Sequence, residues 1–135
     1  AAAIVTTTSL TQGLKSAAGR RRPNGADEES FPSGHTAVAA VHDRLAAINL
    51  RSIDLHPEAR RVLDAGLDAI TIGTSWARIE AGWHYPSDTL VSASLGAFFA
   101  SFYNEAFLGL DRPTAPAVAL GVVPGGASLR VNWRF

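Results

Sequence analysis

Residues 31–50 read FPSGHTAVAAVHDRLAAINL. Ser33 is a residue type that caps helix N-termini, and Gly34 follows it directly. The apolar residues after them recur every three or four positions, at Val38, Val41, Leu45 and Ile48. This spacing is typical of one face of a helix. We therefore predict a helix that starts near Ser33 or Gly34 and continues to about residue 50.

Helices are predicted on both sides of this stretch. One covers 1–18 and ends at Gly19. Residues 20–32 combine arginines, acidic residues and prolines, which is the composition of a loop. A further helix covers about 58–79, and after a turn at 80–86 the last one covers about 86–108.

The two later helices carry distinct faces. For 58–79 we expect an apolar face of Leu63, Leu67, Ile70 and Thr74, with Asp64 and Asp68 on another face. For 86–108 we expect a heavy stripe of Val91, Leu95, Phe98 and Phe102. Its small face of Ala93, Ala97 and Ala100 would let another helix come close.

The composition changes after residue 110. Prolines and glycines replace the helix formers, and from Ser128 apolar and polar residues alternate, which predicts a half-buried strand. We expect it to pair with 118–122 across a turn at 124–126 and to pack on the helices or on a partner. The sequence therefore predicts a helical core over 1–110 and a tail over 111–135 that carries a short β-hairpin.

The overall composition excludes some classes of protein. With 135 residues the chain suits one domain, and a hydrophobic fraction of 47% excludes a disordered chain. Twelve Lys and Arg balance twelve Asp and Glu, so we do not expect a nucleic-acid partner. There is no cysteine and therefore no disulfide framework. Because the chain begins at Ala1 and contains no Met, we expect a processed or truncated piece.

Three segments carry chemistry. A helix start at Ser33 and Gly34 offers free backbone N–H groups to an anion. His84 and Asp88 are four residues apart, so the carboxylate can fix one ring nitrogen and leave the other free. The same segments supply a second histidine and three cations, which are His35, Lys15, Arg22 and Arg78. This inventory suits a tetrahedral oxyanion, whereas the spacing of the ligand types does not indicate a metal site.

Each segment also has a plain structural interpretation. The Pro-Ser-Gly turn can be an ordinary helix cap, and the His84–Asp88 pair can lie on the surface. Arginines 20–22 beside the acidic residues 27–29 can form a solvated, self-neutralising loop. The functional interpretation therefore rests on the three segments together.

The order K-x6-RP (Lys15 to Pro23), PSGH (Pro32 to His35) and R-x5-H-x3-D (Arg78 to Asp88) resembles the type 2 phosphatidic acid phosphatase superfamily. That superfamily also contains bacterial acid phosphatases and vanadium haloperoxidases. The resemblance spans about residues 10–108. It implies an all-α helical bundle that needs no metal, although this chain is shorter before the first motif than full-length members.

The resemblance also implies a role for each motif residue. His84 would attack phosphorus and become a phosphohistidine, Asp88 would orient His84, and His35 would protonate the leaving group and then activate water. The phosphoryl oxygens would be held by Lys15, Arg22, Arg78, Ser33 and the Gly34 amide.

We expect a metal-independent phosphatase without a cofactor that hydrolyses phosphate monoesters or lipid pyrophosphates, with a phosphorylated lipid or a small phosphoester as its substrate. We expect it in the periplasm or at a membrane surface, with its site on the non-cytoplasmic side. One alternative is a haloperoxidase in which the same cations hold vanadate, which is otherwise only a phosphate mimic. Another is a catalytically silent fragment that binds phospholipid or serves assembly.

Overall fold

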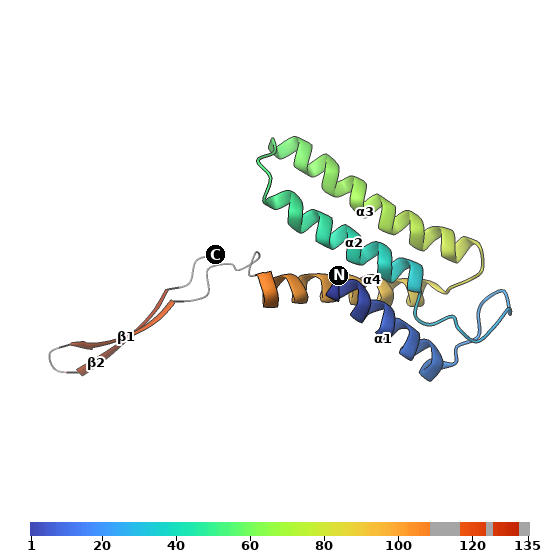
Figure 1. Cartoon of the computed structure of the whole chain (residues 1–135), viewed down its shortest axis with the longest axis horizontal. Helices are drawn as coiled ribbons and strands as arrows, with labels where there is room; N and C mark the ends of the chain where they lie inside the picture. Colours follow the sequence, from blue (N-terminus) through green and yellow to red (C-terminus); the bar gives the residue numbers. More distant parts are fainter. Residues whose placement is uncertain (109–116, 124–125, 133–135) are drawn as a thin grey trace.

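The structure is a computed structural model that describes residues 1–108, 117–123 and 126–132. Four helices form the main body (Figure 1): α1 (Ala2–Ala18), α2 (Gly34–Arg51), α3 (Pro57–Glu80) and α4 (Pro86–Leu108). Helix α2 contacts the other three helices, and α1 also contacts α4. The predicted all-α helical architecture is thus confirmed for this part of the chain.

The helix boundaries follow local signals in the sequence. Gly19 ends α1 in the left-handed conformation (φ 53°), and its N–H donates to the carbonyl of Lys15. Ser33 caps α2, because its side chain accepts from the N–H of Thr36. Pro86 begins α4, a position that suits proline because the first helical N–H has no partner within the helix.

Helices α2 and α4 pack closely through small residues. The buried centre contains Ala3, Val41 and Ala100, with Ile4, Leu45 and Tyr103 packed against it. A Cβ added to Gly96 of α4 would overlap the carbonyl oxygen of Ala37 and lie 2.9 Å from the Cβ of Ala40. The predicted close approach on the small face of 86–108 is therefore present, and Gly96 is the residue that permits it.

Many of the large apolar side chains of α3 and α4 are exposed. Ile70 is 64% exposed, whereas Asp64 is half-buried and Thr71 donates to Asp43 of α2 at 2.8 Å. Several of the largest apolar side chains on these two helices are exposed: Val62, Leu63, Ile70, Ile72, Trp76, Leu90, Val91, Phe98, Phe102 and Phe107. On α4 the small residues already occupy the contact with α2, so the bulky side chains lie outside it.

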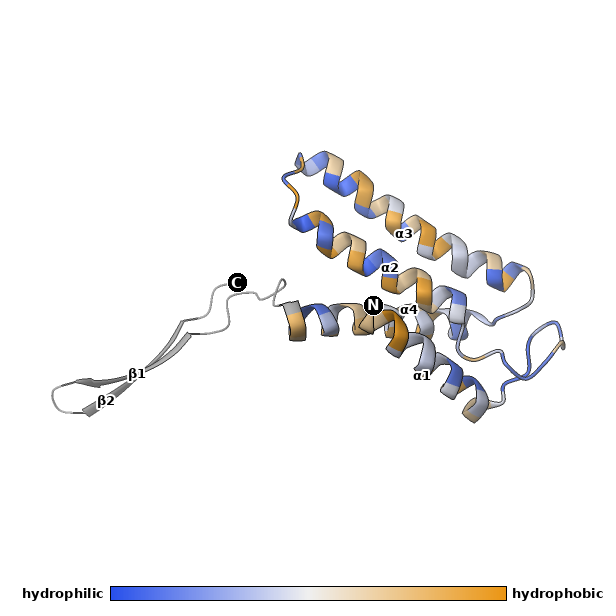
Figure 2. Ribbon diagram, viewed as in Figure 1, coloured by the Kyte–Doolittle hydropathy of each residue, from blue (hydrophilic) through white to orange (hydrophobic). Residues whose placement is uncertain are grey.

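Figure 2 shows that hydrophobic and hydrophilic residues alternate along α3. Within the described part of the chain, no helix combines the length and the apolar character needed to cross a bilayer.

In the tail, the backbone of β1 (Ala117–Val123) pairs antiparallel with β2 (Gly126–Asn132), and Ala117 lies opposite Asn132. The turn at 124–125 and the last three residues of the predicted strand lie outside the described residues. The complete hairpin and its packing therefore stay a prediction.

Candidate functional site

One end of the helical bundle gathers all three motifs around a cavity of about 420 Å³. Its walls come from α1, the 20–32 loop, the start of α2, the end of α3 and the turn before α4. The lining residues are Thr8, Thr11, Gln12, Lys15, Arg22, Gly34, His35, Val38, Arg78 and His84. Six of the eight residues predicted for the site therefore share one cavity, although they lie up to 69 positions apart in the sequence.

His84 is almost fully buried at the end of the turn that joins α3 to α4. Its Nδ1 lies 2.5 Å from the backbone carbonyl oxygen of Ser30. Because a carbonyl oxygen only accepts, Nδ1 must carry the proton, and Nε2 keeps its lone pair. Burial lowers the pKa of His84 to about 4, and the positive charges of Lys15 and Arg22 contribute to this shift. The ring is thus neutral near pH 7.

Asp88 is fully buried in the first turn of α4, beside the His84 ring. The spacing of His84 and Asp88 predicts a hydrogen bond between the two, but Asp88 Oδ2 lies 3.8 Å from Nδ1, which is too long for one. This oxygen instead accepts from the hydroxyl of Ser30 at 2.5 Å and from the N–H of Tyr85 at 2.8 Å. Asp88 therefore reaches His84 through Ser30, whose hydroxyl contacts the carboxylate and whose carbonyl holds the ring.

Lys15 and Arg22 bring positive charge from the first motif. Lys15 is 8% exposed, and its Nζ donates to the carbonyl of Glu29. Burial lowers the pKa of Lys15, and the charge of Arg22 lowers it further. Arg22 donates from Nε to Asp27 at 2.5 Å and from a terminal nitrogen to the carbonyl of Trp83 at 3.3 Å. The loop is thus partly self-neutralised, yet it keeps one guanidinium at the cavity.

Arg78 lies in the last turn of α3 and also lines the cavity. Its Nε is buried and has no hydrogen-bond partner among the described residues. Both arginines lie against one indole, with guanidinium carbons 4.9 Å (Arg22) and 5.3 Å (Arg78) from the ring centre of Trp83. A buried, unpaired guanidinium N–H beside other cations is a strong indication that an anion binds here.

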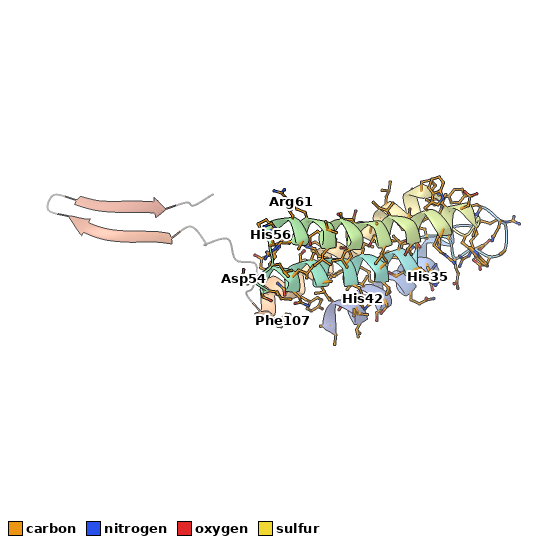
Figure 3. The ribbon with its side chains drawn as sticks, turned by 90° about the horizontal axis from the view of Figure 1, so that it is seen from above. His35, His42, Asp54, His56, Arg61 and Phe107 are labelled. Carbon is orange, nitrogen blue, oxygen red and sulfur yellow. The ribbon has the colours of Figure 1, made fainter. Side chains whose placement is uncertain are left out.

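The start of α2 supplies the second motif. Gly34 and the exposed His35 line the cavity, and the first N–H groups of a helix have no partner within it. Ser33 is fully buried outside the lining: its hydroxyl caps α2, and its N–H donates to Ser92 at 2.6 Å. In Figure 3, His35 lies near the loop end of α2, with His42 further along the helix and His56 at the far end.

Sequence reasoning missed three residues that hold the site together: Arg20, Ser30 and Trp83. Ser30 precedes the Phe-Pro-Ser-Gly-His stretch by one residue, and Trp83 directly precedes His84. Their position beside the motifs was the available signal. Arg20 was concealed in a run of three arginines in which the sequence does not distinguish the paired residue from the exposed one.

A scan against protein-family models matches residues 1–110 to the PAP2 superfamily. Searches of curated proteins and of solved structures gave no match. The family match covers most of the chain and includes every residue that lines the cavity. On this match, together with the three motifs in order, the chain belongs to the PAP2 superfamily, whose members are generally phosphatases.

Proposed function

We propose that this chain hydrolyses phosphate esters through a phosphohistidine intermediate on His84. The observation that carries the proposal is the shared cavity, where Lys15, Arg22 and Arg78 surround the neutral imidazole. A phosphoryl group in transfer spreads negative charge over its equatorial oxygens, so fixed positive donors stabilise its transition state. Arg78 lines the cavity, so its guanidinium can donate to such an oxygen.

In the first step, Nε2 of His84 attacks phosphorus, a P–N bond forms and the P–O bond to the leaving group breaks. His35, as its imidazolium, gives a proton to the departing alkoxide. The exposed position of His35 at the cavity suits a group that must reach the leaving oxygen. The proton stays on Nδ1, which donates it in a hydrogen bond to the Ser30 carbonyl oxygen, and this hydrogen bond stabilises the positive ring that forms.

In the second step, neutral His35 takes a proton from water, the water oxygen attacks phosphorus and the P–N bond breaks. Inorganic phosphate leaves and His84 returns to its neutral form. Both steps use only side chains and backbone N–H groups of this chain. The proposed reaction therefore needs no metal ion.

For the substrate, we propose phosphorylated lipids, taken up at a membrane surface outside the cytoplasm. The supporting observation is the set of large apolar side chains that α3 and α4 expose, including Trp76 and Phe98. Activity on phosphatidate in mixed micelles and on p-nitrophenyl phosphate measures this preference. A clear preference for the soluble ester would contradict the lipid assignment and leave the chemistry intact.

The test of the chemistry is phosphoenzyme trapping with a ³²P-labelled ester in the presence of EDTA, followed by a base quench. We expect label on the unchanged chain and none on His84→Ala, with turnover reduced by about three orders of magnitude. His42→Ala is the matched control, because His42 is exposed on α2, does not line the cavity and has its ring hydrogen-bonded to the carbonyl of Val38. Label on His84→Ala would refute the nucleophile assignment.

Two other outcomes would favour the alternatives. Halide oxidation by the vanadate-loaded chain with peroxide, in place of phosphate release, would indicate a haloperoxidase. Binding of a phosphorylated ligand without any turnover would indicate a silent binding module.

A further inference from the structure

Arg20 makes a set of contacts that none of the motif roles includes. Its terminal NH1 donates to Oδ1 of Asp88 at 2.6 Å and to the hydroxyl of Ser87 at 2.8 Å. Its guanidinium carbon lies 4.2 Å from the ring centre of Tyr85. The side chain is 40% exposed, whereas the carboxylate that it contacts is fully buried. Arg20 therefore lies between the solvent and the buried carboxylate of Asp88.

Arg20 also contacts Ser30, the other residue that adjoins the His84 ring. The backbone carbonyl of Arg20 accepts from the N–H of Ser30 at 2.8 Å. Ser30 in turn holds Nδ1 of His84 through its carbonyl and Oδ2 of Asp88 through its hydroxyl. Arg20 thus binds both groups that flank the imidazole, one with its side chain and one with its backbone.

Resting on the function proposed above, we infer that Arg20 is the positioning residue for His84: it fixes Asp88 and Ser30 around the ring and balances the carboxylate charge. It does not line the cavity, so it acts through these two residues and not on the substrate. The inference gives a specific role to one of three consecutive arginines.

The charge on Arg20 matters because His84 is surrounded by ionisable groups from every neighbouring element. Lys15 comes from α1, Arg22 from the loop, His35 from α2, Arg78 from α3 and Asp88 from α4. Lys15 and Arg22 lower the pKa of His84, whereas Asp88 raises it. Loss of the Arg20 charge removes the cation that pairs with Asp88, so we expect the pKa of His84 to rise.

The experiment compares Arg20→Gln with Arg21→Gln in the full chain. Arg21 is its exposed neighbour, so the control removes the same charge from the same loop. NMR titration of the His84 ring, assigned from its absence in His84→Ala, measures the pKa without any substrate. For Arg20→Gln we expect the pKa of His84 to rise by about half a pH unit or more. The acid limb of the pH–rate profile should move by the same amount, and kcat should fall about ten-fold. Arg21→Gln should match the parent in all three.

Arg20→Lys separates the effect of the positive charge from that of the guanidinium geometry. It is also the variant to measure if Arg20→Gln does not fold. It keeps the positive charge and loses the planar contact with Tyr85, so we expect the parent pKa for His84 with a lowered kcat. The inference would be overturned if Arg20→Gln kept the parent's pKa of His84 and the parent's kcat, or if Arg20→Lys kept the parent's kcat. If the parent shows no phosphatase activity, the proposed function fails, and the NMR titration still decides whether Arg20 controls His84.

Discussion

Gly96→Ala is the most direct test of the packing that brings the motifs together. A Cβ at this position would overlap the carbonyl oxygen of Ala37, and it would lie 2.9 Å from the Cβ of Ala40 and 3.1 Å from the nitrogen of Val41. Carbon atoms in good contact are about 3.5–4.0 Å apart. Helix α4 must therefore move away from α2 by roughly 0.6–1 Å, and overpacking of this kind costs about 1–3 kcal/mol.

Gly73→Ala is the matched control, because a Cβ at Gly73 of α3 meets nothing within 4 Å. Alanine there should raise the free energy of unfolding by about 0.5–1 kcal/mol through helix propensity alone. Urea denaturation measures the change in the free energy of unfolding, which should be negative for Gly96→Ala and positive for Gly73→Ala. Phosphatase activity should fall only in Gly96→Ala, because α2 carries His35 and α4 carries Asp88. Equal stabilisation by the two alanines would refute the close-packing argument.

Two further predictions concern His84 and Ser33. The pKa of His84 is lowered to about 4 from its ordinary 6.5, so the stability it contributes is complete above pH 6.5 and is lost as the pH falls toward 4. Between pH 7 and pH 4.5, the free energy of unfolding measured with urea should fall by roughly 2 kcal/mol more for the parent than for His84→Asn. An identical pH dependence of the two proteins would contradict the lowered pKa of His84. Ser33→Ala should cost about 1 kcal/mol by removing the cap of α2, whereas Ser52→Ala at the exposed other end of that helix should stay within about 0.5 kcal/mol. Thermal unfolding compares the latter pair, and equal Tm values would refute the capping role.

The sequence allowed the helices and their ends to be predicted because those signals are local. Gly19, Ser33 and Pro86 each act through their own backbone geometry, and the structure places helix ends beside all three. The gathering of the cations was also predictable, since three positive side chains and a helix start share one use in binding an oxyanion.

The partner of the His84 ring was not predictable in the same way. The ring contacts a backbone carbonyl, that of Ser30, and every residue type offers the same carbonyl group. The apolar spacing along α3 also did not indicate which of its faces contacts α2. The spacing grouped Ile70 with Leu63 and Leu67 on one face, but the contact between α2 and α3 includes the polar pair of Asp43 and Thr71, and Ile70 is exposed.

The indole of Trp83 lies against two guanidiniums, those of Arg22 and Arg78, at the wall of the cavity. A dianion that draws those groups toward itself changes the electric field across the ring and therefore the light that the ring emits. Trp83, one residue before the proposed nucleophile, is thus placed to report on occupancy of the cavity, and the fluorescence change that is lost in Trp83→Phe separates its signal from that of Trp76 and Trp133.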